Sequence, residues 1–518
     1  MMVANFFDRS LAAAMEVLRG ADPAAFRSRL SRLAVTLSFD RSAVMSSEGR
    51  VALEMATDLM ARFYPGLALI PLDAAAETAA FADTLKRAAR SIHPGIELRP
   101  QPAKVVYRLV AGATAPSDGG ACAFFGSQGW TALVDDAEPM GCLDSGNPFG
   151  AAAAACLGVA RAFRSVFSDD LGGVVADGRV EFDVLHQALR CSPAAPRLPS
   201  GIDLAGIHLV GLGAIGRSAA WTLSRVAGLC GEFHGVDHET IERSNLQRYV
   251  GATQNDQAKS RPKTRAVARM FENTLVDFRG HPFTWGKYLA EKGDCDLDAV
   301  AVALDTASGR IAIQASLPRR LLNAWTQPGD LGASRHDFLS GPCLACLYLP
   351  EGKGRSLSEN IADALRLPEM EIREKLHVGF KVNRAFLVRV EAATGVAAEV
   401  LRPFEGEPLS VFYSKAVCGT AHFGPSRGGD RGAAAVPMAF QSALAGVLLA
   451  AEIIAEVAPL RTDALPPLTK INLLRPLGRY LTEPSTKHAS GTCLCQDPYY
   501  VSGYRRKWEA RSATRSAT

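Results

Sequence analysis

The sequence lacks a dominant charge of either sign. It holds 57 Lys and Arg residues against 53 Asp and Glu residues in 518, so its formal net charge is only +4. Such a balance argues against nucleic acid as the main partner. Apolar residues make up 48% and charged residues 21% of the chain, close to the average of soluble globular proteins. A disordered, collagen-like or mostly coiled-coil protein is therefore not expected.

Long apolar runs are also missing. The most apolar windows, Ala151–Ala160 and Ala443–Ala451, are shorter than the roughly 20 residues that a membrane-spanning helix needs. Asp8 and Arg9 lie where a signal peptide requires apolar residues. These features predict a cytoplasmic protein without a membrane partner.

The 11 cysteines are not expected to form disulfides, because a cytosolic chain of this length keeps its thiols reduced. Two short pairs stand out, Cys343-Leu-Ala-Cys346 and Cys493-Leu-Cys495. Four thiolates form a closed tetrahedral zinc site, so the pairs predict a structural Zn²⁺ that ties the C-terminus to the preceding domain. The alternative is four unconnected buried thiols.

A proline-rich stretch, Ser192-Pro-Ala-Ala-Pro-Arg-Leu-Pro199, is typical of an interdomain linker. It predicts one domain over residues 1–195 and another over residues 200–500, which suits the length of the chain. Residues 501–518 repeat Arg-Ser-Ala-Thr and are expected to form a disordered basic tail.

The first domain is predicted to be α/β. Helical patterns cover Val51–Tyr64 and Ala152–Val166, and β-like apolar runs cover Leu67–Leu72 and Val105–Val110. This part of the sequence contains no glycine-rich phosphate loop.

The second domain alternates strands and helices. The expected order is a strand at Gly206–Val210, a helix at Arg217–Ala227, a strand at Glu232–Val236, a helix near Lys263–Glu272 and a strand at Asp298–Ala303. This order predicts a doubly wound parallel sheet.

Two further segments interrupt or follow that sheet. Residues 351–415, particularly Leu357–Glu399, are rich in charged helix formers and predict a helical insertion. Pro437–Ala458 is expected to be a long, largely buried helix.

A glycine motif lies between the first strand and helix of the second domain. Gly211-Leu-Gly-Ala-Ile-Gly216 contains three glycines, Gly211, Gly213 and Gly216, that would let a phosphate approach the helix N-terminus. Asp237 follows Gly216 by 21 residues, where an acid that binds ribose is expected. The alternative is a glycine turn that only packs the helix on the strand.

Three segments then narrow the choice of nucleotide. They are Val236-Asp-His-Glu-Thr-Ile-Glu-Arg-Ser-Asn-Leu-Gln-Arg248, Lys259-Ser-Arg-Pro-Lys263 and Ala303-Leu-Asp-Thr-Ala-Ser-Gly-Arg310. Over roughly Gly201–Arg320 they resemble the adenylation domain of the ThiF/MoeB and ubiquitin-activating enzyme superfamily. The resemblance implies that ATP is bound here.

The resemblance also assigns roles to single residues. It implies that Asp237 binds the ribose hydroxyls, Asn245 lines the nucleotide site, Arg248 and Lys263 contact the phosphates, and Asp305 holds Mg²⁺. Cations and a metal suit this reaction, because charge builds on pyrophosphate when a carboxylate attacks the α-phosphate.

Other readings of these residues remain open. Arg248 and Lys263 could be solvated surface cations, and Asp305 could cap the following helix. Lys259 competes with Lys263 for the phosphate role. Two positions depart from the family pattern: Glu239 stands where Asp is common, and Tyr249 replaces the usual Gln.

The first domain has its own resemblance. Gly129-Trp-Thr-Ala and Asn147-Pro-Phe-Gly-Ala-Ala-Ala-Ala-Ala-Cys156 are similar to the inactive half of two-half activating enzymes. The chain is thus expected to contain two adenylation-type, Rossmann-like halves, the first degenerate and the second active. They would form a pseudo-dimer, with further homodimerisation possible. Inactive halves of this kind can contribute an arginine to the ATP site of the other half. The candidates here are Arg27, Arg29 and Arg32, and a solvated helix face explains these arginines equally well.

The segment Ser414-Lys-Ala-Val-Cys-Gly-Thr-Ala-His-Phe-Gly contains Cys418 and resembles the catalytic-cysteine crossover of autophagy-type and bacterial defence-type activating enzymes. Lys415 and His422 would favour its thiolate. The alternative is an inert cysteine, since Cys230 and Cys295 lie in the same half.

The resulting expectation is an enzyme that activates a ubiquitin-like protein, most similar to those of antiphage conjugation operons of the Bil type. It would adenylate the C-terminus of its partner, capture it as a thioester and pass it to a separate conjugating enzyme, because no conjugating-enzyme domain is expected in this chain. The alternatives are a sulfur-carrier adenylyltransferase without a thioester step, a nicotinamide-dependent oxidoreductase and a non-enzymatic binding module.

Overall fold

The computed structural model describes most of the chain, which divides into two compact units. Unit 1 comprises Met1–Leu349 and Pro437–Thr518, and unit 2 comprises Pro350–Val436. Both α/β halves therefore belong to unit 1. The described residues are 4–18, 22–33, 35–99, 107–117, 120–173, 177–189, 196–293, 297–327, 329–349, 357–413, 416, 436–477 and 485–515.

The first half of unit 1 is built on a sheet with the strand order β3-β2-β1-β4-β5-β6-β7-β8. Strands β1 to β5 pair in parallel, and β6 to β8 extend the sheet antiparallel. The predicted strands of this half overlap β2 and β4. The strands are β1 (Val35–Phe39), β2 (Gly66–Pro71), β3 (Glu97–Leu98), β4 (Tyr107–Ala111), β5 (Cys122–Gln128), β6 (Thr131–Asp135), β7 (Val180–Asp183) and β8 (Ala188–Leu189).

Helices cover this sheet. The two predicted helices overlap α4 and α6, which begin earlier because Ser46 and Asn147 cap them by accepting hydrogen bonds from Gly49 N and Phe149 N. The helices are α1 (Phe7–Val17), α2 (Pro23–Arg32), α3 (Arg41–Met45), α4 (Ser47–Ala61), α5 (Ala76–Ile92) and α6 (Pro148–Val166).

The loop after β1 contains a buried carboxylate that binds backbone amide groups of the first half. Asp40 is buried, and its carboxylate accepts hydrogen bonds from the backbone N–H groups of Ala43, Ala113 and Thr114 at 2.8 to 3.2 Å. Burial raises the pKa of Asp40, but these and other hydrogen bonds outweigh it and lower the pKa overall. The chain's own carboxylate thus satisfies amide groups of the kind that bind a phosphate in an active half.

The second half is built on a sheet with the order β11-β10-β9-β12-β13-β14-β15, parallel from β11 to β13. The chain passes from β9 to β10 and β11 on one side, then returns to β12 on the other. The sheet is therefore doubly wound, as predicted, with its switch point between β9 and β12. The strands are β9 (Ile207–Val210), β10 (Cys230–Val236), β11 (Leu275–His281), β12 (Ala299–Val302), β13 (Arg320–Thr326), β14 (Leu331–Asp337) and β15 (Leu468–Ile471).

The helices of this half include the long apolar helix that the sequence predicted. They are α7 (Ala214–Leu223), η1 (Arg243–Gln247), α8 (Gln254–Ala258), α9 (Lys263–Ala268), α10 (Trp285–Lys292), α11 (Ala307–Ala315), η2 (Leu344–Leu347), α17 (Ala439–Val457), η5 (Leu494–Gln496) and α18 (Pro498–Arg515).

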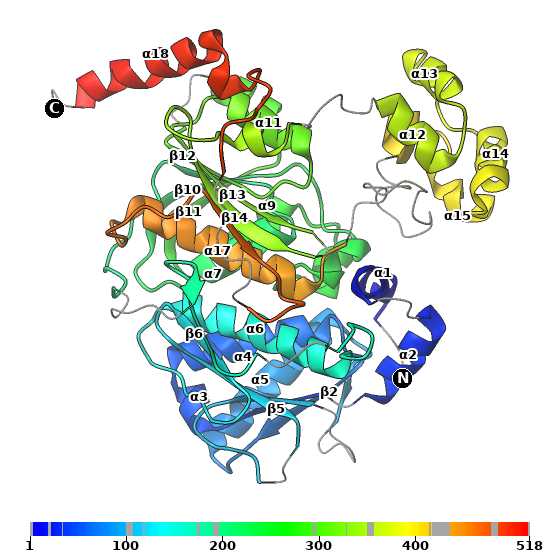
Figure 1. Ribbon diagram of the computed structural model, residues 1–518. Coiled ribbons are helices and arrows are strands. Elements are labelled where there is room, and N and C mark those ends of the chain that lie inside the picture. The colour runs from blue at the N-terminus through cyan, green and yellow to red at the C-terminus, as the bar shows by residue number, and fades with distance from the viewer. Residues whose placement is uncertain are drawn as a thin grey trace. The chain divides into compact units, whose positions relative to one another are not determined.

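The two sheets of unit 1 share a helical layer (Figure 1). Helix α17 packs on α6 of the first half and on α7, β13 and β14 of the second. A Cβ added at Gly446 would lie 2.5 Å from the Ile215 carbonyl oxygen, so α17 and α7 touch backbone to backbone. Helices α6 and α17 are long and apolar enough to cross a membrane, but 94% and 83% of their most apolar windows are buried in the structure. Each is placed as a core helix.

A buried carboxylate joins the two halves. Glu452 on α17 is 2% exposed and receives hydrogen bonds from Arg335 at 2.7 Å, from Arg461 at 2.6 Å and from the first-half residue Gln187 at 2.6 Å. Burial raises the pKa of Glu452, but the charges of the two arginines outweigh this and lower the pKa to about 2. The ionised form is therefore the stabilising one.

Replacing Glu452 by Gln is expected to lower the free energy of unfolding at pH 7 by about 3 kcal/mol, because two buried guanidinium groups lose their counter-charge. Since the folded-state pKa lies below the unfolded value, this contribution is complete above pH 4.5 and declines as the pH falls toward 2. Urea titrations of wild type and Glu452→Gln at several pH values measure the difference. The exposed Glu16→Gln is the control, and a difference independent of pH would contradict the assignment.

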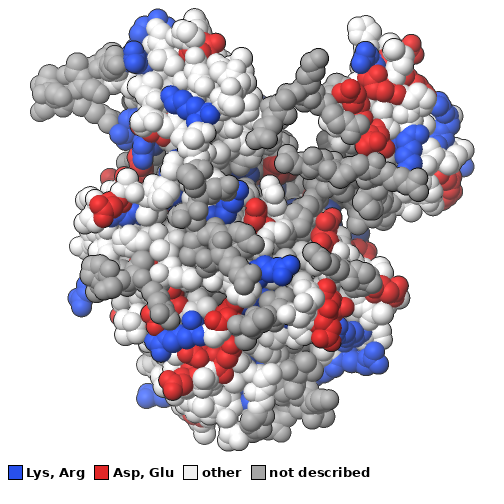
Figure 2. All heavy atoms as spheres, viewed as in Figure 1, with Lys and Arg blue, Asp and Glu red and all other residues white. Residues whose placement is uncertain are grey.

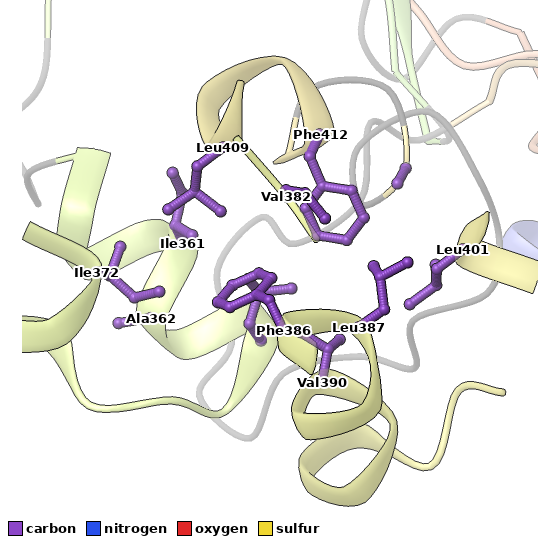
Figure 3. Packing of buried hydrophobic residues seen from close by; sticks show 12 residues of the cluster. Ile361, Ala362, Ile372, Val382, Phe386, Leu387, Val390, Leu401, Leu409 and Phe412 are labelled. Atoms are coloured by element: carbon purple, nitrogen blue, oxygen red, sulfur yellow. The ribbon is translucent and has the colours of Figure 1, made fainter. Parts of the chain in front are cut away.

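Unit 2 is a small helical domain with its own core. Its described helices are α12 (Leu357–Leu365), α13 (Glu369–His377), α14 (Arg384–Thr394), α15 (Ala398–Leu401), η3 (Arg402–Phe404) and α16 (Leu409–Phe412). Figure 3 shows Ile361, Phe386, Leu401 and Phe412 turned toward one another, and all four are buried. The sequence predicted helices in this segment.

The C-terminal segment differs from the expectation. Residues 501–518 were predicted to be a disordered tail, but α18 continues to Arg515. It is held because Tyr504, Lys507 and Trp508 donate hydrogen bonds to the carbonyl groups of Arg319, Ser316 and Leu317 at 2.9 to 3.2 Å. These carbonyls follow the C-terminus of α11, where backbone acceptors lack helical partners.

Charged side chains are mixed over the visible face of the molecule. Figure 2 shows Lys and Arg interspersed with Asp and Glu there. This mixture agrees with the small net charge of +4.

Candidate nucleotide and metal sites

The three glycines of the loop between β9 and α7 have different roles. Gly211 has φ +88°, and a Cβ there would lie 2.7 Å from the Ala303 carbonyl oxygen. A Cβ at Gly216 would overlap the carbonyl oxygen of Gly211. Both positions therefore require glycine for backbone packing alone.

Gly213 is not required by packing. In the described part of the chain, Tyr249 Oη is the one atom within 4 Å of a Cβ built there, at 3.4 Å. Gly213 is also the N-cap residue of α7. The space beside the helix N-terminus is thus left open for an anion.

Asp237 ends β10 and is bound to this loop. It is 9% exposed, and its carboxylate accepts hydrogen bonds from Leu212 N at 2.7 Å and Glu239 N at 2.9 Å. Because β9 and β10 are neighbours, the acid and the glycine loop share the carboxyl edge of the sheet.

Lys263 begins α9 and points to the same edge. Its ammonium pairs with Glu239, lies 3.9 Å from Asp237 Oδ2 and lies 5.3 Å from the centre of the Tyr249 ring. Burial lowers the pKa of Lys263, but Tyr249 and the two carboxylates outweigh it, so the pKa is raised overall. Lys263 is 4% exposed and is not a solvated surface cation, whereas its rival Lys259 is exposed.

Asn245 and Arg248 lie on and directly after η1. Both are half-buried. Asn245 Oδ1 accepts a hydrogen bond from Glu242 N at 2.9 Å, which completes a capping box. Arg248 contacts Gln247 Oε1 at 3.4 Å.

Asp305 follows β12 at the same sheet edge and is exposed. Thr306, not Asp305, caps α11, because its hydroxyl accepts the hydrogen bond of Gly309 N at 3.2 Å. The buried Arg310 donates to the Leu304 carbonyl and, at 2.6 Å, to Tyr348 Oη, which anchors the loop before Asp305. An exposed carboxylate at this edge suits a hard divalent cation.

Cys418 lies outside the described residues, as do its neighbours Lys415 and His422 and the alternative Cys295. Among described cysteines of the first half, burial raises the pKa of Cys142 to about 12 and also raises that of Cys156. Neither has the lowered pKa of a reactive thiol.

The predicted arginines of the first half remain within that half. Arg27 pairs with Asp8 at 2.6 Å, and Arg29 pairs with Asp170 at 2.6 Å. Arg32 Nε donates to the Ser28 carbonyl at 3.2 Å.

Arg9, on α1, is the arginine that sequence reasoning missed. Burial and the charge of Arg248 lower the pKa of Arg9 to about 10, with Glu242 and Tyr249 opposing them. Helix α1 packs on η1. Arg9 therefore lies near the Ser-Asn-Leu-Gln-Arg segment of the second half, and its position in the sequence gave no means of predicting this.

The four predicted zinc ligands come together. Cys343, Cys346, Cys493 and Cys495 are buried, and their ligand atoms lie within 4.8 Å of one another, with closest Sγ pairs at 3.3 to 3.9 Å. A zinc ion with Zn–S bonds of about 2.3 Å separates its sulfurs by roughly 3.8 Å. The cluster can hold a metal such as zinc.

Purified protein is expected to contain about one zinc per chain, and Cys346→Ser to contain little, because a tetrahedral thiolate site fails with a missing ligand. Metal analysis of the intact chain measures this. Cys230→Ser, outside the cluster, is the control and should keep its zinc. Equal zinc in wild type and Cys346→Ser would contradict the assignment.

Comparisons with known proteins agree with this geometry. Residues 200–493, more than half of the chain, match the ThiF family. An uncharacterized protein of Sinorhizobium fredii, y4jF, is 42% identical over 511 residues, which cover 98% of each chain. The fold and the glycine loop define an adenylyltransferase-type protein. The chain belongs to the ThiF family.

Solved structures are more distant. The crystal structure of E. coli MccB with succinimide is 13% identical, has a TM-score of 0.34 and matches 56% of this chain and 67% of that chain. A second E. coli MccB structure is 18% identical, with a TM-score of 0.26 over 40% of this chain and 57% of that chain.

The first half gives a further match. Residues 38–168 match a family described as Prokaryotic E2 family C. The expectation that the chain contains no conjugating-enzyme domain is contradicted by this family match. These residues nevertheless form the parallel, Rossmann-like sheet described above.

Proposed function

We propose that this chain is an ATP-dependent activating enzyme for a ubiquitin-like protein. The observation that carries the proposal is the shared sheet edge, where the open space at Gly213, the carboxylates of Asp237 and Asp305 and the ammonium of Lys263 meet. The match of residues 38–168 to a family named for E2 supports a conjugation partner. The antiphage setting and the cytoplasmic location follow from the resemblance and composition.

In this proposal, acidic and basic residues bind different parts of the nucleotide and its metal. Asp237 would bind the ribose hydroxyls, and Asn245 would line the site. Lys263 and Arg248 would hold the phosphates, with Arg9 adding positive charge from the first half. Asp305 would hold Mg²⁺, which neutralises phosphate charge when bound.

The first step joins two substrates. A carboxylate oxygen at the partner's C-terminus attacks the α-phosphorus of ATP, and the bond from that phosphorus to the bridging oxygen breaks. Pyrophosphate leaves and an acyl-adenylate remains. Lys263 and Arg248 stabilise the charge that develops on pyrophosphate because they are preorganised donors at its position.

The second step uses Cys418. Its thiolate attacks the acyl carbon, the bond to AMP breaks and AMP leaves, so the partner becomes a thioester. A cysteine of a conjugating enzyme then attacks that carbon and releases Cys418. A sulfur-carrier adenylyltransferase would stop after the first step.

Asp305→Ala is expected to lower partner-dependent exchange of pyrophosphate into ATP by at least about 100-fold, because the metal loses its protein ligand. Exchange of labelled pyrophosphate measures the step, with a candidate ubiquitin-like protein as the substrate. Asp277→Asn, an exposed acid on β11, is the control. Normal exchange in Asp305→Ala would reject this role of Asp305, and no exchange by wild type would reject the proposed function.

Cys418→Ala is expected to abolish the thiol-sensitive adduct with the partner while pyrophosphate exchange persists, because adenylation precedes capture. Non-reducing gels with and without dithiothreitol detect the adduct. Cys230→Ala should leave it unchanged. An unchanged adduct in Cys418→Ala would exclude this cysteine and favour the sulfur-carrier alternative if no other thiol is modified.

A further inference from the structure

Tyr249 lies next to the glycine loop between β9 and α7. The residue is 3% exposed, and its hydroxyl oxygen lies 3.4 Å from the position of a Cβ at Gly213. A phosphate that enters the space beside Gly213 must therefore pass within contact range of this hydroxyl. A phenol hydroxyl can donate a hydrogen bond to a phosphate oxygen.

Cationic side chains from different elements surround the same ring. The Lys263 ammonium lies 5.3 Å from the ring centre. Arg9 and Arg217 each interact electrostatically with Tyr249. The hydroxyl thus lies near cations of α1, α7 and α9, and Glu239 and Asp237 offset the charge of Lys263 in part. A phosphate bound at this hydroxyl would interact favourably with these cations.

Arg217 of α7 adds a buried positive charge, which Asp256 and Asp58 offset in part. It is 2% exposed, and its Nε donates to the Val250 carbonyl at 2.7 Å. Its Nη1 is buried and has no hydrogen-bond partner among the described residues. A buried, unpartnered donor on a charged group is costly, so nearby negative charge would stabilise it.

We propose that Tyr249 is a phosphate-binding residue of this chain: its hydroxyl donates a hydrogen bond to an oxygen of the nucleotide phosphates beside Gly213. Arg217 is a positioning residue that stabilises this arrangement electrostatically from within the protein. The proposal rests on the proposed function and extends it to two residues to which the resemblance gives no role. Neither residue forms or breaks a covalent bond.

Tyr249→Phe is expected to weaken the binding of ATP with Mg²⁺ about 10-fold and to leave adenosine binding unchanged, because only the phosphates lose a donor. Isothermal titration calorimetry with both ligands measures this without the partner protein. In the exchange assay, KM for ATP should rise about 10-fold, with a smaller change in kcat. Tyr249→Gln, which restores a donor, should recover part of the affinity.

The matched control is Tyr504→Phe. It removes the hydroxyl that binds the Arg319 carbonyl at 2.9 Å, just before β13 and thus at the opposite edge of the sheet. Both affinities should remain at the wild-type level. A parallel loss in this control would show that the change at Tyr249 is not specific to the phosphates.

Arg217→Met removes a charge while keeping the Tyr249 hydroxyl. It is expected to weaken ATP binding by a similar factor in low and high salt, because interactions of a buried charge are little screened, and to leave adenosine binding unchanged. Equal losses for both ligands would assign Arg217 a structural role only.

The outcomes separate this proposal from the proposed function. If the wild type exchanges pyrophosphate and Tyr249→Phe binds ATP with unchanged affinity, the proposed role of Tyr249 is rejected and the proposed function stands. A loss of adenosine affinity in Tyr249→Phe also overturns it, since the hydroxyl would then serve the nucleoside. Wild type that binds ATP without exchange rejects the function and leaves the Tyr249 test valid. Wild type that binds no ATP overturns both.

Discussion

Backbone-to-backbone packing of α7 is the constraint on which the active half depends. On one side, Gly216 brings the helix against the carbonyl of Gly211 at the end of β9, and on the other Gly446 of α17 contacts the carbonyl of Ile215. A side chain at either position would force the helix outward, and overpacking of this kind costs about 1–3 kcal/mol. With α7 held in this way, its N-terminus stays at the carboxyl edge of the sheet, where Asp237 and Lys263 also lie.

The two halves share an architecture but differ in how the loops at the carboxyl edges of their sheets are filled. In the first, the carboxylate of Asp40 accepts the hydrogen bonds that the amide groups after β1 and β4 donate. In the second, Asp237 accepts a hydrogen bond from the loop amide of Leu212, and the space beside Gly213 remains open near the ammonium of Lys263. The first half contributes packing surface and Arg9, whereas the second keeps an open space at the N-terminus of α7, where an anion is favoured.

The cysteine cluster and the nucleotide edge are joined through one helix. Helix α11 begins two residues after Asp305, and carbonyls beyond its C-terminus accept hydrogen bonds from α18. Tyr504 and Trp508 of α18 pack with the four cysteines in a single buried cluster. A metal held by the four cysteines would stabilise the C-terminal end of α11. Because the N-terminal end of α11 follows the loop of Asp305, the metal would contribute structurally to that site.

The sequence by itself determined the features that depend on local spacing. Alternating strands and helices predicted the doubly wound sheet, the glycine motif predicted the loop, and paired cysteines predicted a four-thiol cluster. Only the tertiary structure decided which distant charges meet. Arg9 lies near Arg248 of the second half, whereas Arg27 pairs with Asp8. Helix α18 is held in place because its side chains donate hydrogen bonds to carbonyl groups almost 200 residues earlier in the sequence. Such pairings depend on how helices pack against one another in space, and this packing cannot be predicted from the spacing of residues along the chain.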